Sequence, residues 1–288
     1  MTHSKNTKQQ ENMVGSSETI RKTPDFYLFS HLVADQKVYT KPFDWSQIQP
    51  HMPQHLHKYS PQFLEWFVGF SEGDGSFFSS GDRLFFTITQ KDPALLYKLR
   101  TQLGFGVICN DTQNPEIKRF TVTDRKWIRV LIHIFNGNLL LRKTQSRFTL
   151  WLQHWNQITG DTIECINRWD PSSVNPKHPD PGLRVNQNPQ MSACWRQTSQ
   201  VWQTGWLAGF LEAEGCFAAG FEKRKPVLRF ILDQTGELEI LAHLRLLLGD
   251  YGSVWIRKST QEQDGNVKHH YRFETKHREE IENIIDYI

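Results

Sequence analysis

Two similar stretches decide the fold, WFVGFSEGDGSF at residues 66–77 and WLAGFLEAEGCF at residues 206–217. The second begins 140 residues after the first, so that Gly69 aligns with Gly209 and Asp74 with Glu214. An internal repeat of this kind indicates a duplicated structural unit.

The similarity continues beyond these stretches, since residues 85–106 resemble 228–252 and residues 118–135 resemble 271–288. In each copy the pattern predicts a helix that ends at the acid and glycine, then a β-hairpin, a second helix, two short strands and a final helix. The predicted fold class is therefore α+β, built from two related halves. The predicted hairpin strands are 76–80 and 83–89, with counterparts at 216–221 and 227–233, and the predicted second helices are 93–103 and 237–248.

Hydrophobic and polar residues alternate along the hairpin strands, as in Leu84, Phe86 and Ile88. This period of two predicts a sheet with one face packed on helices and one face exposed. The polar and basic side chains expected on the exposed face are Arg83, Thr87, Thr89, Arg229, Asp233 and Arg257.

Gly69 and Gly209 lie in the middle of the two predicted motif helices, where glycine costs roughly 1 kcal/mol relative to alanine. A cost repeated in both copies predicts that the two helices pack closely, related by a pseudo-twofold axis. Asp74 and Glu214, at the helix ends, then face each other across this axis. Paired carboxylates at negative helix ends repel unless cations neutralise them, and oxygen ligands favour Mg²⁺ over zinc.

Composition limits the function classes. The 288 residues carry a net charge of +3, so a nucleic-acid binder would need its basic residues concentrated on one face. We expect no membrane span, because the sequence has no apolar run of sufficient length, and no secretion signal, because its first residues are polar. The four cysteines form no C-x-x-C pair. We therefore expect an intracellular protein with reduced thiols. The predicted organisation is a disordered or extended region at 1–60, a domain at 61–165, a linker at 166–199 and a second domain at 200–288.

The paired motifs are diverged copies of the LAGLIDADG sequence, and the chain resembles the single-chain, two-motif LAGLIDADG homing endonucleases. The resemblance implies two pseudo-twofold halves, each with an antiparallel DNA-binding sheet backed by helices, and with the motif helices at the centre. It also implies a monomer that cleaves both strands of a long DNA site. Most relatives are encoded within introns, which implies an organellar protein of a mitochondrion or chloroplast.

Residue roles follow from the same resemblance. The second acid of each motif, Asp74 and Glu214, is the expected ligand of Mg²⁺, for which Mn²⁺ is the expected substitute. The backbone carbonyls of Gly73 and Ala213 are the expected additional ligands. The remaining expected catalytic residues are Gln90 and Gln234, which order solvent, and Lys143, which polarises water or neutralises phosphate.

The resemblance also assigns a DNA-binding role to part of the predicted sheet surface. A basic run at the predicted tip of the second hairpin is suited to phosphate contacts. The expected DNA-binding residues are Arg83, Thr87, Thr89, Lys223, Arg224, Lys225, Arg229 and Arg257.

The chain departs from the family at its second repeat. Aligning Phe120 with Phe273 makes Ile288 the partner of Phe135, so the second repeat carries no equivalent of residues 136–155 and no counterpart of Lys143. The alternative functions are an intron maturase, which binds structured intron RNA, and a non-cleaving LAGLIDADG binder of DNA or RNA. A duplicated α+β protein of unrelated function and a glycosidase-type carboxylate pair are further alternatives.

Overall fold

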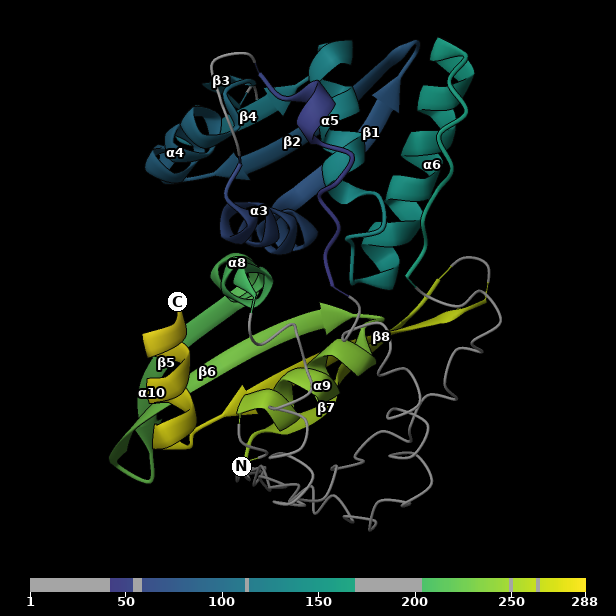
Figure 1. The fold of residues 1–288 in the computed structure, drawn as a ribbon. Coiled ribbons are helices and arrows are strands. Elements are labelled where there is room, and N and C mark those ends of the chain that lie inside the picture. Colours follow the sequence, from purple (N-terminus) through teal and green to yellow (C-terminus); the bar gives the residue numbers. More distant parts are fainter. Residues whose placement is uncertain (1–41, 54–58, 112–113, 169–203, 249–250, 263–264) are drawn as a thin grey trace, which may run out of the picture.

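The computed structural model describes residues 42–53, 59–111, 114–168, 204–248, 251–262 and 265–288. It has two α+β halves on opposite sides of a central helix pair (Figure 1). The predicted fold class is confirmed. The elements of the first half are η1 (Gln49–His51), α3 (Pro61–Asp74), β1 (Gly75–Ser80), β2 (Arg83–Gln90), α4 (Pro93–Leu103), β3 (Val107–Asn110), β4 (Lys118–Val122), α5 (Arg125–Phe135) and α6 (Arg142–Thr159).

The second half repeats this order without an equivalent of α6 among the described residues. Its elements are α8 (Gly205–Glu214), β5 (Gly215–Glu222), β6 (Lys225–Thr235), α9 (Leu238–Leu248), β7 (Ser253–Gln261), β8 (Val267–Thr275) and α10 (Arg278–Tyr287). No helix among the described residues is long and apolar enough to cross a membrane.

Each half contains one antiparallel sheet of four strands, in the orders β1-β2-β4-β3 and β5-β6-β8-β7. The hairpin register is the same in both, since Phe77 lies opposite Phe86 and Phe217 opposite Phe230. The predicted hairpins and second helices are thus confirmed, with small shifts at their ends.

The motif helices α3 and α8 approach at their glycines. A Cβ atom added at Gly69 would lie 2.0 Å from the carbonyl oxygen of Trp206, and one at Gly209 would lie 2.0 Å from the carbonyl oxygen of Trp66. Real Cβ atoms do not come that close to a backbone oxygen, so only glycine permits this separation of the helices. Contact between the two backbones accounts for the helix-breaking residue in both motifs.

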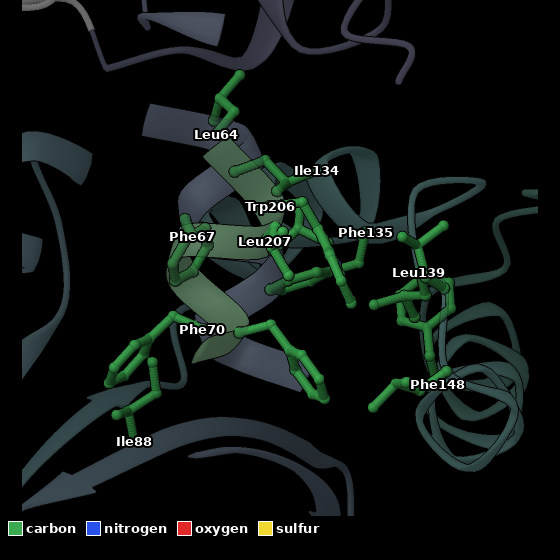
Figure 2. Close-up of a cluster of buried hydrophobic side chains, with 14 of the residues drawn as sticks. Leu64, Phe67, Phe70, Ile88, Ile134, Phe135, Leu139, Phe148, Trp206 and Leu207 are labelled. Carbon is green, nitrogen blue, oxygen red and sulfur yellow. The ribbon is translucent and has the colours of Figure 1, made fainter. Parts of the chain in front are cut away.

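The core continues through this helix pair. Figure 2 shows Phe67 and Phe70 of α3 and Trp206 and Leu207 of α8 in one buried cluster with Phe135 of α5. The hydrophobic contacts of both halves therefore meet at the centre, and they fix how the C-terminal ends of α3 and α8 lie relative to each other.

Segments on either side of the predicted first domain also contact this half. Part of the region expected to be disordered or extended, residues 42–53, packs on this half: Ile48 is buried, and Asn138 exchanges two hydrogen bonds of 2.9 Å with the backbone of Asp44. Arg168, assigned to the linker, is buried and donates to the carbonyls of Gly137 at 2.7 Å and Pro42 at 3.1 Å. Residues 1–41 and the linker positions 169–199 lie outside the described residues.

Candidate active site at the paired helix ends

The two predicted acids occupy equivalent positions at the C-terminal residues of their helices. Asp74 ends α3 and Glu214 ends α8, and each is followed by a glycine that begins the next strand. A Cβ atom added at Gly73 would lie 2.6 Å from the Cβ of Ala213 and 2.8 Å from the Cγ of Glu214. The structure therefore brings together Asp74, Glu214 and the two residues whose carbonyls were expected to assist them.

Asp74 is half-buried and is held by Gln90, whose Nε2 donates to Asp74 Oδ2 at 2.5 Å. Burial raises the pKa of Asp74 to about 6, the hydrogen bond from Gln90 lowers it, and the negative charge of Glu214 raises it. Among the described residues, no basic side chain lies within ion-pair distance of Asp74. Glu214 is thus close enough to Asp74 to disfavour the ionised form of the Asp74 carboxyl.

Lys143 crosses from the first half to the acid of the second half. Its Nζ donates to Gln234 Oε1 at 2.7 Å and lies 3.9 Å from Glu214 Oε1. Gln234 is only 2% exposed, and its Nε2 has no hydrogen-bond partner in the described structure. The predicted residues therefore form two unequal groups, Asp74 with Gln90 and Glu214 with Gln234 and Lys143.

The first acids of the two motifs have different surroundings. Glu72 is fully buried and accepts hydrogen bonds from the amides of Leu140 and Leu141 and from Trp206 Nε1. Burial raises the pKa of Glu72 to about 7, although these hydrogen bonds lower it. Its counterpart, Glu212, is exposed and accepts from Trp66 Nε1 at 2.8 Å. Glu72 therefore fixes the loop that leads to Lys143.

A third buried carboxylate, Glu237, reaches the same loop from the second half. It accepts from the Lys143 amide at 2.7 Å, and burial raises its pKa to about 7. No local sequence pattern identifies this role of Glu237, because its partner Lys143 lies 94 positions away in the sequence.

The first sheet presents part of the expected DNA-binding surface. Arg83 and Thr89 are exposed on β2. Thr87 is a correction, since it is only 8% exposed. It lies on a central strand between Ser76 and Thr121, and these neighbours cover it on both sides.

The second sheet carries its basic side chains in ion pairs. Arg257 and Arg272 both bind Asp233, at 2.8 and 2.7 Å, and Arg229 binds Glu222 at 2.5 Å. The arginines hold the pKa of Asp233 below its usual value. The charges of Arg229 and Arg257 are therefore partly neutralised within the protein.

The basic run lies at the tip of the second hairpin. Lys223 and Arg224 connect β5 to β6, Lys225 is the first residue of β6, and all three are exposed. Lys223 and Arg224 have φ angles of +47° and +66°, in the left-handed region that favours glycine. Two long basic side chains thus occupy positions that cost conformational energy.

The donor set suits a hard divalent cation. Among the described residues, no group of three or more His, Cys, Asp or Glu side chains is arranged to hold a metal ion by itself. Mg²⁺ is typically held by one or two carboxylates together with water and substrate phosphate, which matches two carboxylates at adjoining helix ends. The unpartnered Nε2 of buried Gln234, next to Lys143 and Glu214, also indicates that solvent or substrate completes the site.

Comparison with known proteins agrees with this geometry. Residues 67–155 match the model of the LAGLIDADG endonuclease family. The chain is 32% identical over 196 residues to "Probable intron-encoded endonuclease 4" of Neurospora crassa, which covers 65% of this chain and 31% of that protein. It is 26% identical over 218 residues to "Uncharacterized cox1 intron-2 37.2 kDa protein" of Schizosaccharomyces pombe, covering 74% and 58%. The chain thus spans less than two thirds of each relative's length.

Two solved structures share the fold. The LAGLIDADG meganuclease I-AabMI bound to uncleaved DNA has a TM-score of 0.52 and 21% identity, over 78% of this chain and 82% of that one. The LAGLIDADG homing endonuclease I-GzeII in complex with its DNA target has a TM-score of 0.51 and 21% identity, over 77% and 82%. At these identities the likeness shows the fold, with its two pseudo-symmetric halves.

Proposed function

We propose that this chain, which belongs to the LAGLIDADG endonuclease family, is a site-specific endonuclease that hydrolyses phosphodiester bonds in double-stranded DNA with divalent metal ions. The observation that supports this most is the juxtaposition of Asp74 and Glu214 at the adjoining ends of α3 and α8. The names of the relatives, which refer to introns and to endonucleases, also support it.

The proposed metal ligands are the carboxylates of Asp74 and Glu214 with the carbonyls of Gly73 and Ala213. When bound there, Mg²⁺, or Mn²⁺ in its place, supplies Lewis-acid activation of water and stabilises the leaving oxygen. The pKa of Asp74 is raised first by burial and then by the charge of Glu214, and a bound cation would offset both effects by stabilising the ionised carboxylate.

The other proposed catalytic residues act through hydrogen bonds and charge. Lys143, beside Glu214, supplies a positive charge that stabilises the negative charge developing on the phosphate oxygens. Gln90 orients the Asp74 carboxylate, and the unpartnered Nε2 of Gln234 donates to solvent or to a phosphate oxygen.

The proposed DNA surface is formed by the sheet faces of both halves. Exposed side chains of the first sheet and of the second hairpin tip contact phosphates, whereas Arg229 and Arg257 exchange acidic partners for phosphates on binding. We propose a monomer, because α3 already pairs with α8 within one chain, and an organellar location, because two relatives are named for cox1 introns. The proposed DNA-binding residues are Arg83, Thr89, Lys223, Arg224, Lys225, Arg229 and Arg257; Thr87 is left out because it is buried.

A non-cleaving binder of DNA or of structured intron RNA is the second candidate. The unequal surroundings of the two acids favour it, since Lys143 lies beside Glu214 and no basic side chain of the described residues pairs with Asp74. The ion pairs on the second sheet also leave that face less positive than the arginine count suggests.

Cleavage of a plasmid library with randomised duplex inserts in Mg²⁺ tests the proposal. We expect wild-type protein to cut or nick, and we expect Asp74→Asn and Glu214→Gln each to abolish the reaction. Glu212→Gln is the matched control, because Glu212 is an exposed acid two residues from Glu214, and it should retain activity. Cutting that survives Asp74→Asn would overturn the proposed site. Binding without cutting in Mg²⁺ or Mn²⁺ would favour the second candidate.

A further inference from the structure

The loop before α6 is held by carboxylates from both halves of the molecule. Glu72 of the first half accepts from the amides of Leu140 and Leu141. Glu237 of the second half accepts from the Lys143 amide at 2.7 Å and from the Arg142 amide. Four successive backbone N–H groups are therefore bound by two buried carboxylates, where α6 begins without a side-chain cap of its own.

Resting on the function proposed above, we propose that Glu237 is a positioning residue for Lys143, and that it fixes the lysine beside the acid of the second half. Glu237 holds the backbone of Lys143, while Gln234 holds its Nζ at 2.7 Å. The backbone amide and the side-chain amine of Lys143 are thus both bound by residues of the second half, three positions apart in the sequence. The Nζ is thereby placed 3.9 Å from Glu214 Oε1.

Glu237 differs from an ordinary helix-capping residue on the surface because its carboxylate is buried. Glu237 is 2% exposed, and a buried carboxylate is kept only when its oxygens are well bound. A second contact joins the same two halves, since Arg142 Nη2 at the start of α6 lies 3.6 Å from Glu239 Oε1 on α9. The N-terminus of α6 is therefore tied to the second half by two acids, and the acids fix where Lys143 emerges.

This arrangement makes the site depend on both halves. The lysine comes from the first half, while the acid it accompanies and the residues that position it come from the second. A shift of one half relative to the other would move Lys143 away from Glu214, and a displacement of about 1 Å in an active site costs up to about a hundredfold in rate.

Single-turnover cleavage with a double-mutant cycle tests the proposal. At saturating Mg²⁺ and DNA, Glu237→Ala should lower the rate by about tenfold or more. The affinity for DNA should stay within about twofold, because Glu237 is buried away from the sheet surface. Glu237→Gln should rescue part of the rate, since its amide oxygen still accepts from the backbone. In a Lys143→Met background, Glu237→Ala should cause no further loss.

Glu280→Gln is the matched control for losing a buried carboxylate. Glu280 is 1% exposed and accepts from the Tyr251 amide at 2.9 Å, on α10 of the same half. It should leave the cleavage rate within about twofold of wild type. An equal loss from Glu237→Ala in the wild-type and Lys143→Met backgrounds would overturn the proposal.

A second readout separates this proposal from the proposed function. Acylation of lysine amines, followed by peptide mass spectrometry, reports the accessibility of Lys143 without any DNA, with exposed Lys98 as the internal standard. Glu237→Ala should raise the labelling rate of Lys143 about fivefold, the equivalent of one lost hydrogen bond. If the wild-type protein cuts no DNA, the endonuclease proposal fails while this measurement still decides the positioning. Unchanged Lys143 labelling would overturn it.

Discussion

The indole Nε1 of Trp206 donates to the carboxylate of Glu72 at 2.6 Å, and thereby joins the start of α8 to the end of α3. The pseudo-twofold axis repeats this contact with Trp66 and Glu212, at 2.8 Å. Only the first pair is buried, because the loop at residues 140–141 covers Glu72 and no described residue covers Glu212 in the same way. The same motif therefore forms a core interaction in one copy and a surface interaction in the other.

Trp206→Phe should destabilise the protein by at least about 2 kcal/mol, because a buried carboxylate loses a charge-assisted hydrogen bond and the smaller ring leaves space. Trp66→Phe should cost at most about 1 kcal/mol, because water can replace the bond to Glu212. Urea denaturation of the two variants measures the difference. Equal losses would contradict the distinction between the two pairs.

Phe77 and Phe217 provide a second matched pair, since they occupy the same place in the two hairpins. Phe77 is 8% exposed and packs against Phe148 and Trp151 of α6, with ring centroids 5.8 and 5.3 Å apart, whereas Phe217 is 44% exposed. Phe77→Ala should cost about 3–5 kcal/mol in unfolding free energy, and Phe217→Ala about 1 kcal/mol or less. A comparable loss at Phe217, measured by thermal or urea unfolding, would show that this position is covered in solution.

The hairpin tip offers a test of DNA contact that does not depend on cleavage. Replacing Lys223–Arg224 with Asn-Gly supplies residues that favour positive φ, so stability should rise by up to about 1 kcal/mol. If both side chains contact phosphates, the slope of log affinity against log salt should fall in magnitude by about 2. A slope that matches wild type over a salt titration would assign these residues to the surface alone.

The buried acids predict how stability depends on pH. Burial raises the pKa of Glu237 from 4.5 to about 7, so between these values the folded protein keeps a proton that the unfolded chain has lost. The free energy of unfolding should therefore fall as pH rises from 4.5 to 7, by up to about 3 kcal/mol from this group. Glu237→Gln should remove most of this decline, about 2 kcal/mol, between urea titrations at pH 5 and at pH 7.5. The charge of Glu237 also raises the pKa of Glu72, so its removal should flatten the decline in the same direction. An identical pH dependence in both proteins would refute the contribution.

Sequence patterns specified the repeated architecture because they are local. Alternation along strand 83–89 sets which side chains face the helices, and it predicted β2 to within one residue of its end. The two mid-helix glycines indicated close helix packing because their cost is intrinsic to the backbone. These features need no knowledge of distant residues.

Contacts between distant residues could not be obtained in this way. The resemblance to the LAGLIDADG family singled out Lys143, but it did not predict that this residue of the first half lies beside Glu214 of the second. Glu237 was missed because its role arises from a contact between residues 94 positions apart. Residues 42–53 were assigned only to a disordered or extended region, because their scattered aromatic residues show no period that specifies what they pack against.

By itself, the sequence determined that two copies of one α+β unit meet through glycine-bearing helices, with Asp74 and Glu214 at their ends. Helix and strand periodicity, and the conformational cost of glycine in a helix, depend on neighbouring residues, so they can be recognised from one sequence. The tertiary structure alone decided that the two acids have different partners and that Glu72 is buried while Glu212 is not. Burial and hydrogen bonding depend on which distant loops cover a side chain, and only the folded molecule brings those loops together.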